Sequence, residues 1–336
     1  MPGSLEQFAQ YFRDVTVSRG FKYHFLAVEP QPDKPTLLFL HGFPSTSNDW
    51  HYQIVHFHAK GFGLIVPDLL AYGGTDKPLD PAAYSLKAMS QDVLDIVDSL
   101  SWSATARIIV VSHDWGAAFH CRLALYHQNR FFASVYLAVG GLPFTQSVVD
   151  FDVLLPILKK TFGRELLAYQ EFFARSPDAA QAIEQNFDSV LDIMYPNDSS
   201  LWERILCVRG KMEDWIRNGK RAARGSWALP QDIDFTRDSL LAGGMAAPLN
   251  WYKASNDGFW VAEDQELSNN WTQIEHPALF IGATRDAVCI PPFGRAVAQG
   301  FHKNISFAEL DTGHWIYLEQ PDAVNSELDA FFSKIL

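Results

Sequence analysis

Residues 111–117 read V-S-H-D-W-G-A and follow the apolar run R-I-I-V-V at 107–111. The small residues Ser112 and Gly116 stand two positions before and after Asp114. This spacing is typical of a sharp turn between a strand and a helix, which raises the central side chain into a pocket. Such a turn usually carries a serine, and here it carries a carboxylate. The stretch therefore predicts a strand, a turn and a helix, with Asp114 as the candidate nucleophile.

An aspartate at the start of a helix has a simpler interpretation, because Asp is also a common helix N-cap. The free N–H groups and the dipole at that end favour a carboxylate anion in either case. The flanking small residues and the preceding apolar strand favour the nucleophile over the cap.

Strand-like runs alternate with helical segments in the first half of the chain, which favours a mainly parallel sheet. The runs L-L-F-L and I-I-V-V are apolar throughout, as expected for strands covered on both faces. Helices are predicted over residues 85–100, with Ser85 as the cap, and from Asp114 to about His127. The expected strands are residues 14–18, 22–28, 36–40, 63–66, 107–111 and 134–139.

The character of the sequence changes at G-G-L-P, residues 140–143, after which it is helical and rich in aromatic residues to about residue 270. Strand patterns return at 276–283 and 304–310, and residues 321–336 resemble a closing helix. We therefore predict one α/β domain, residues 1–140 and 271–336, which is interrupted by a helical insertion at 141–270.

Composition narrows the functional classes. Among the 336 residues 48% are hydrophobic, and the net charge of −12 argues against nucleic acid as a partner. Cys121, Cys207 and Cys289 form no CxxC or Cys/His motif, so neither a disulfide framework nor a metal site is predicted. With no signal-peptide pattern and no apolar run of membrane-spanning length, we expect a cytoplasmic protein.

The motif H-G-F-P at residues 41–44 directly follows the strand T-L-L-F-L. Gly42 permits backbone conformations closed to other residues, and Pro44 fixes the turn. Such a loop can aim the Phe43 N–H into the pocket, and the N–H of Trp115 can point there as well. Two converging N–H groups would form an oxyanion hole.

Two further motifs complete a catalytic constellation. Asp286 follows one late strand in I-G-A-T-R-D, and His314 follows the last strand in D-T-G-H-W. The carboxylate of Asp286 can bind one ring nitrogen of His314 and so fix its tautomer and orientation. Each residue alone is an ordinary loop residue, but the chain order nucleophile, acid, histidine, with each at a strand end, favours a triad with Asp114.

These motifs resemble the α/β-hydrolase family, and the aspartate at residue 114 narrows the resemblance to epoxide hydrolases and haloalkane dehalogenases. The resemblance implies an α/β-hydrolase fold with a helical cap, residues 141–270, over the active site. It also implies that Asp114 attacks an sp³ carbon to form an alkyl-enzyme ester. His314, oriented by Asp286, would then activate water to hydrolyse that ester.

Two tyrosines favour epoxide hydrolases over haloalkane dehalogenases as the group that this sequence resembles. The stretch P-L-N-W-Y at 248–252 resembles the epoxide hydrolase motif whose tyrosine donates a proton to the epoxide oxygen, which indicates Tyr252. The stretch L-A-Y-Q-E-F-F at 167–173 resembles the segment that supplies the second tyrosine, Tyr169. Tyr195, in I-M-Y-P-N, is the alternative for this second role.

The expected reaction is hydrolysis of an epoxide to a vicinal diol, without a cofactor. The alternatives are a haloalkane or haloacid dehalogenase with the same triad, and a non-catalytic receptor with this fold. We expect His41, Pro44, Trp251 and Trp315 to line an apolar substrate pocket suited to aryl or fatty-chain epoxides. The biological role would be detoxification or turnover of lipid epoxides, by a monomer or a homodimer.

Overall fold

The computed structural model describes residues 5–336, apart from the side chain of Thr105. Its centre is an eight-stranded sheet in the order β1-β2-β4-β3-β5-β6-β7-β8. Strand β2 pairs antiparallel with β1 and β4, and the remaining neighbours are parallel. The strands are β1 (Phe12–Thr16), β2 (Lys22–Val28), β3 (Thr36–Leu40), β4 (Gly63–Pro67), β5 (Ile108–His113), β6 (Ala133–Leu137), β7 (Ala278–Ala283) and β8 (Ile305–Leu310).

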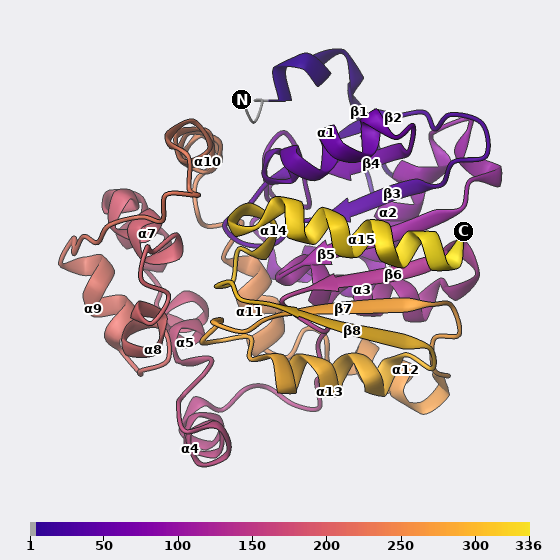
Figure 1. The fold of residues 1–336 in the computed structure, drawn as a ribbon. Helices are drawn as coiled ribbons and strands as arrows, with labels where there is room; N and C mark the ends of the chain where they lie inside the picture. Colours follow the sequence, from indigo (N-terminus) through magenta and orange to yellow (C-terminus); the bar gives the residue numbers. More distant parts are fainter. Residues whose placement is uncertain (1–4) are drawn as a thin grey trace.

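Helices cover both faces of the sheet and fill the long connection between β6 and β7 (Figure 1). The helices of the sheet domain are α1 (His51–Ala59), α2 (Leu86–Asp98), α3 (Trp115–Tyr126), α13 (Pro291–Phe301), α14 (Ile316–Glu319) and α15 (Pro321–Ile335). The connection contains α4 (Phe151–Phe162), α5 (Ala168–Arg175), α6 (Ala179–Gln185), α7 (Phe187–Met194), α8 (Leu201–Ile205), α9 (Lys211–Arg217), α10 (Pro230–Gly243), α11 (Asn250–Asn256) and α12 (Val261–Asn270). Short 3₁₀ helices lie at Leu5–Tyr11, Ser47–Trp50, Pro81–Tyr84, Ser103–Thr105 and Gln128–Arg130.

The predicted strands and helices on both sides of the turn at Asp114 are present. Every residue of β3 and β5 is buried, as their continuous apolar sequences predicted for strands covered on both faces. Ser85 caps α2, because its Oγ accepts the backbone N–H of Ala88 at 3.0 Å. The boundaries differ by one or two residues. Strand β1 begins two residues before the predicted start, and β5 extends to His113, so that the turn begins immediately after it.

The helices between β6 and β7 occupy two places. Figure 1 shows α4, α5 and α7–α10 grouped beyond one end of the sheet, whereas α12 lies near α13 on the side of the sheet domain. A buried ion pair holds α12 to α3, with Arg122 Nε 2.6 Å from Asp264 Oδ1. The Arg122 guanidinium also donates to the carbonyls of Leu142 and Pro143, where the chain leaves the sheet domain.

Aromatic side chains connect the helical segment to the sheet domain. Trp315 Nε1 donates to the carbonyl of Met194 at the end of α7, at 2.6 Å. Trp251 Nε1, on α11, donates to the carbonyl of Leu70 at 2.9 Å. Both indoles are buried, so these bonds satisfy donors that would otherwise be costly to remove from water. They fix α7 and α11 above the carboxyl ends of the central strands.

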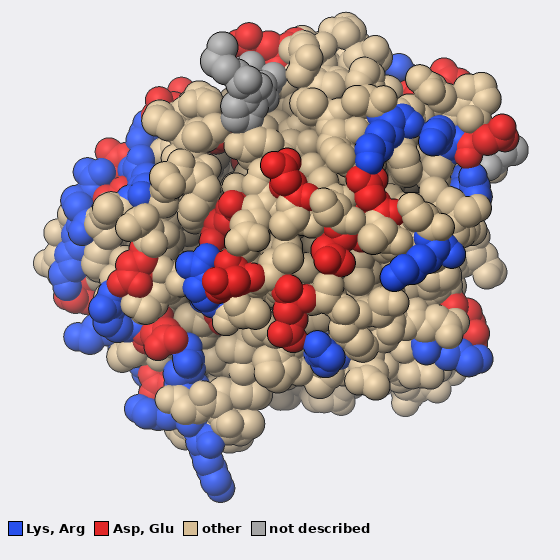
Figure 2. Space-filling view, viewed as in Figure 1, with Lys and Arg blue, Asp and Glu red and all other residues tan. Residues whose placement is uncertain are grey.

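The outer helices carry most of their charge in ion pairs. Figure 2 shows Lys and Arg interspersed with Asp and Glu on the visible face, with blue side chains frequent over α8 and α9. Arg217, for example, pairs with Asp178 and Glu213 on either side of it. Exposed pairs of this kind contribute at most about 1 kcal/mol each, so packing dominates the stability of this segment. Within residues 5–336, the helices are too short or too polar to cross a bilayer.

Candidate active site

Asp114 occupies the turn between β5 and α3, in a backbone conformation rare for residues with a side chain, with φ of 52° and ψ of −126°. The neighbouring glycines make this turn possible. A Cβ on Gly116 would collide with the carbonyl oxygens of Leu40 and His41, and one on Gly42 would collide with the Asp114 carboxylate. The small residues in both motifs therefore let two loops meet around one carboxylate.

The Asp114 side chain does not cap its helix, which removes the simpler interpretation of this residue. Its Oδ1 instead accepts the backbone N–H of Phe43 at 2.8 Å. Burial would raise the pKa of Asp114, but the hydrogen bond and charge of His314 outweigh burial and hold that pKa below its usual range. The carboxylate is therefore ionised at neutral pH, as a nucleophile must be.

His314 lies between two carboxylates. Its Nδ1 is 2.6 Å from Asp286 Oδ2, and its Nε2 is 3.6 Å from Asp114 Oδ2. Burial alone would lower the pKa of His314, but the charge of Asp286 and the bonds to both carboxylates raise it well above the usual value. The structure thus brings together the three residues that chain order had suggested, Asp114, Asp286 and His314.

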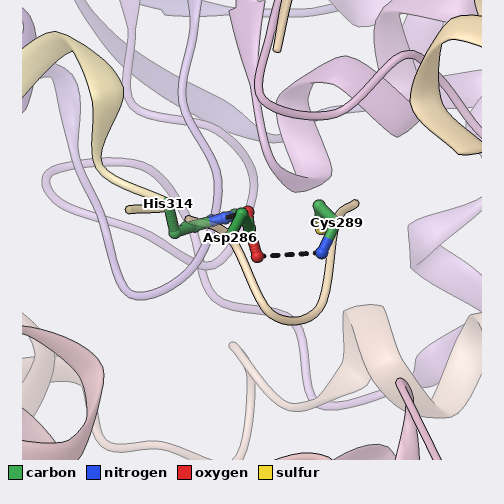
Figure 3. A group of neighbouring side chains, drawn as sticks. All are labelled: Asp286, Cys289 and His314. Atoms are coloured by element: carbon green, nitrogen blue, oxygen red, sulfur yellow. Dashed lines mark hydrogen bonds and ion pairs between the residues drawn. The ribbon is translucent and has the colours of Figure 1, made fainter. Parts of the chain in front are cut away.

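Asp286 is itself held in place by the backbone. Its Oδ1 accepts the N–H groups of Val288 at 2.9 Å and Cys289 at 2.8 Å, which leaves Oδ2 for His314. Figure 3 shows the carboxylate between the imidazole and the Cys289 backbone. Because both oxygens are used, the carboxylate orients the ring as a fixed acceptor.

These same residues form the one group of potential metal ligands within residues 5–336. Ligand atoms of Asp286, Cys289 and His314 lie within 4.8 Å of one another. The ligand atoms of Asp286 and His314 already form a hydrogen bond with each other. Burial raises the pKa of the Cys289 thiol to about 12, so the thiol stays protonated. The group therefore fits an oriented base with a neutral thiol beside it better than a metal centre.

Hydrogen bonds hold the H-G-F-P loop, residues 41–44, in place beside Asp114. His41 is fully buried, and its Nε2 accepts the backbone N–H of Leu69 at 2.9 Å. Burial lowers the pKa of His41, which keeps this nitrogen free to accept. The carbonyl of Pro44 accepts the hydroxyl of Tyr195 at 2.9 Å. This loop thus aims Phe43 N–H at Asp114 while its own polar groups are satisfied.

A cavity of about 540 Å³ begins at Asp114. Its wall includes Trp115, Tyr169 and Cys289 near the carboxylate, and apolar side chains of α4 farther out, such as Leu154 and Ile157. Cavities of this size and composition accommodate small organic ligands.

Four residues predicted to line this cavity do not do so in the described part of the chain: His41, Pro44, Trp251 and Trp315. The expectation for them is corrected, and each has a physical reason. His41 and Pro44 are used by the backbone and by Tyr195, as described above. The Trp251 and Trp315 indoles are buried with their N–H groups bonded to carbonyls between the two segments.

Tyr169 on α5 and Tyr252 on α11 lie with ring centroids 6.0 Å apart. Tyr252 is not itself in the cavity wall, but it packs edge-on against Trp115, which is, at 5.1 Å and against Phe43 at 5.3 Å. Burial raises the pKa of both tyrosines well above 10, and the negative charge of Asp114 adds to the shift. Both phenols therefore remain protonated donors across the physiological range.

Tyr195, the alternative for the second tyrosine, is engaged elsewhere. Its hydroxyl donates to the Pro44 carbonyl, and its ring stacks on Trp315 with centroids 4.6 Å apart. It therefore connects the helical segment to the H-G-F-P loop, which leaves Tyr169 as the partner of Tyr252.

Several residues beside the site were missed by sequence reasoning. His113 Nε2 donates to the His314 carbonyl at 2.9 Å, and burial lowers its pKa to about 3. Gln170 and Asn256 line the cavity next to the two tyrosines. Their positions gave weak signals: His113 and Gln170 are direct neighbours of Asp114 and Tyr169 in the chain, and Asn256 lies one helical turn after Tyr252.

Comparison with known proteins identifies a family and similar proteins that share this fold. Residues 35–321 match the model of the alpha/beta hydrolase fold family. Epoxide hydrolase 3 of Siraitia grosvenorii is 26% identical over 333 residues, which cover 94% of this chain and 96% of that protein. Epoxide hydrolase A of Mycobacterium tuberculosis is 25% identical over 311 residues, 90% of this chain and 92% of that protein.

Solved structures show the same fold. The crystal structure of epoxide hydrolase A from Mycobacterium thermoresistibile superposes with a TM-score of 0.77 at 22% identity, covering 95% of this chain and 97% of that one. The structure of potato (Solanum tuberosum) epoxide hydrolase I gives a TM-score of 0.76 at 22% identity, covering 96% and 99%.

Proposed function

Because this chain belongs to the alpha/beta hydrolase fold family, we propose its reaction from the chemistry of its own cavity: it is an epoxide hydrolase that converts epoxides to vicinal diols. The observation that carries this proposal is the arrangement of Asp114, Tyr169 and Tyr252. Asp114 and Tyr169 both line the cavity, and the ring of Tyr252 lies 6.0 Å from that of Tyr169. The pKa of Asp114 is lowered, which keeps it ionised, and the pKa values of both tyrosines are raised, which keeps them protonated. A nucleophile and a proton donor are what opening of an epoxide ring requires.

The first step is ring opening. A carboxylate oxygen of Asp114 attacks one carbon of the epoxide, and the bond from that carbon to the ring oxygen breaks. The electron pair stays on that oxygen, which takes a proton from Tyr169 or Tyr252. The product is a hydroxyalkyl ester on Asp114. The two phenols would act where negative charge develops, beside a cavity lined mainly by apolar side chains, so they would stabilise the transition state more than the ground state.

The second step is hydrolysis of the ester. His314, held by Asp286, removes a proton from water, and the hydroxide attacks the ester carbonyl carbon of Asp114. The N–H of Phe43 already points at this side chain, and with the N–H of Trp115 it would stabilise the resulting oxyanion. The alkyl oxygen leaves as an alkoxide and takes the proton held by His314, which releases the diol. The Asp114 carboxylic acid that remains gives up the second proton of the water, and the phenolate regains its proton. The sum of the two steps consumes only water, so no cofactor enters the balance.

A dehalogenase with the same triad is the alternative. It would need N–H donors around a departing halide, whereas the two phenols of Tyr169 and Tyr252 pack together beside this site. A non-catalytic receptor is the other alternative, and the ordered base, with His314 bonded to Asp286, makes that interpretation unnecessary.

The cavity wall and the helical insertion suggest a substrate class and a lid. The apolar outer wall of the cavity suits aryl or fatty-chain epoxides. We infer that the insertion at 141–270 acts as the lid through α4–α11, with α12 anchored to α3 by Arg122 and Asp264. We also propose a cytoplasmic monomer or homodimer, which size-exclusion chromatography and cell fractionation would test.

A paired assay of the purified protein tests the reaction. One arm follows diol formation from styrene oxide and a long-chain epoxide, and the other follows halide release from chloroalkanes, bromoalkanes and fluoroacetate. Diol without halide is expected. Halide without diol would overturn the roles of Tyr169 and Tyr252, and no product in either arm would favour the receptor.

A further inference from the structure

We propose that Asn256 and Gln170 form a directed hydrogen-bond relay that turns the phenolic proton of Tyr169 into the cavity. Gln170 is then a positioning residue for ring opening, acting through Tyr169. This inference rests on the proposed epoxide chemistry and adds to it the residues that decide which way one of the two acids points.

The relay begins at a backbone carbonyl. Asn256 Nδ2 donates to the carbonyl oxygen of Tyr252, one turn earlier on α11, at 2.8 Å. The same Nδ2 donates to Gln170 Oε1 at 3.3 Å. Gln170 Nε2 in turn lies 3.4 Å from the hydroxyl oxygen of Tyr169. Asn256 is 2% exposed and Gln170 9%, and both side chains border the cavity.

The donor direction along this chain is fixed by chemistry. A carbonyl oxygen can only accept, so Asn256 must turn its NH₂ group toward Tyr252. That NH₂ group also faces Gln170, which must therefore present its oxygen. The remaining NH₂ of Gln170 then faces Tyr169. Reversing either amide would place two donors or two acceptors against each other in a buried site, where an unmatched polar group is costly.

The consequence falls on Tyr169. Its oxygen accepts a hydrogen bond from Gln170, so its single proton is free to be donated to another acceptor. Tyr169 borders the cavity, where the epoxide oxygen would supply that acceptor. A hydrogen bond received by the phenol oxygen also favours loss of its proton, because successive hydrogen bonds polarise one another. Gln170 therefore sets both the aim and the readiness of the acid.

Substitution of Gln170 separates this role from simple packing. Gln170→Met keeps the volume and removes the donor, so single-turnover formation of the alkyl-enzyme should slow by about 3- to 10-fold. Gln170→Glu, when ionised at pH 8, can only accept, and it would draw the Tyr169 proton away from the cavity. Ring opening in that variant should then be as slow as in Tyr169→Phe, a loss of about 10²-fold.

The pH dependence gives a readout that a structural role would not change. As pH falls and the introduced carboxylate gains a proton, its O–H can donate to Tyr169 while its other oxygen accepts from Asn256. The rate of Gln170→Glu relative to wild type should therefore rise on acidification, and that of Gln170→Met should not. Gln53→Glu is the matched control, because Gln53 is also buried but bonds to Asn325, away from the cavity.

The outcomes separate the two levels of the proposal. Diol formation by wild type, with Gln170→Glu slower than Gln170→Met at pH 8 and recovering at lower pH, supports the relay. Equal rates for the two variants at every pH, or wild-type rates in both, would overturn the relay and leave the epoxide chemistry intact. Absence of diol formation by wild type would overturn the proposed function and the relay with it.

Discussion

Nε2 of His314 lies 3.6 Å from Oδ2 of Asp114, and this contact changes its character during the proposed reaction. In the free enzyme burial opposes protonation of His314, but the charge of Asp286 and then the bond to the Asp114 carboxylate raise its pKa. Once Asp114 becomes an ester, the ionised acceptor of that bond is gone and the pKa of His314 falls. The histidine thus becomes available as a base at the step that needs one.

The two steps should therefore respond differently to pH. Ester hydrolysis requires neutral His314, so it slows as pH falls through the pKa of His314 in the ester. Ring opening requires ionised Asp114, whose pKa lies below its usual value, so it continues at lower pH. Acidification from pH 8 to pH 5 should increase the fraction of enzyme trapped as ester, measured by rapid acid quench and mass spectrometry. A parallel decline of both steps would contradict this assignment.

Asp286→Asn tests the orienting carboxylate. The amide cannot hold the ring through a charge, and it admits the wrong tautomer, with the proton on Nε2 of His314. We expect ester hydrolysis to slow by at least about 10²-fold while ring opening continues, so that the ester accumulates. Pre-steady-state kinetics would separate the two steps. His314→Gln should accumulate the same ester, and normal turnover in the Asp286 variant would remove that residue from the triad.

Tyr252→Phe and Tyr169→Phe test the acids. Each change should slow ring opening by about 10²-fold, and the double variant should open the ring far more slowly than either. Hydrolysis of an ester already formed should be unaffected, because it uses His314. Tyr195→Phe serves as a comparison, since its hydroxyl is bonded to Pro44 and should affect stability rather than ring opening. A near-normal ring-opening rate in Tyr252→Phe would exclude Tyr252 as a donor.

The chemistry of the site was easier to predict than its walls. Asp114, Asp286 and His314 each follow a strand, and parallel strands bring their carboxyl ends to one edge of a sheet. Their meeting therefore followed from the order of the motifs. Trp251 was misplaced because it adjoins Tyr252 in sequence, whereas consecutive residues on a helix point in directions about 100° apart.

Contacts between distant segments left no comparable signal. Gln170 and Asn256 are 86 positions apart, and their contact depends on how α5 packs against α11. The same holds for Trp315 and Met194, whose hydrogen bond spans 121 positions. Periodicity reports which face of a helix is apolar, but it does not report which partner covers that face. These contacts required the structure.

A buried carboxyl outside the site gives a prediction about stability. Burial, with smaller contributions from Asp232 and Asp68, raises the pKa of Asp49 to about 7, against the effect of its bond from Ser45. The folded state then retains a proton that the unfolded state loses near pH 4, so stability falls as pH rises from about 4 to about 7.

Asp49→Asn should weaken this pH dependence, because the amide stays neutral and can still accept from Ser45. Each unit of the pKa difference corresponds to about 1.4 kcal/mol, so the variant should gain a few kcal/mol relative to wild type between pH 5 and pH 8. Urea unfolding followed at both pH values measures this difference. Identical pH profiles would show that Asp49 is already ionised in the folded protein.

The central claim is that the epoxide carbon becomes bonded to an oxygen of Asp114. A single turnover in ¹⁸O-water, with enzyme in excess over epoxide, tests it most directly. The added diol oxygen should be unlabelled in the first turnover, and one ¹⁸O should appear in the peptide that contains Asp114, with no diol formed by Asp114→Ala. A first-turnover diol that carries one ¹⁸O in every molecule, with no label in that peptide, would contradict the covalent mechanism.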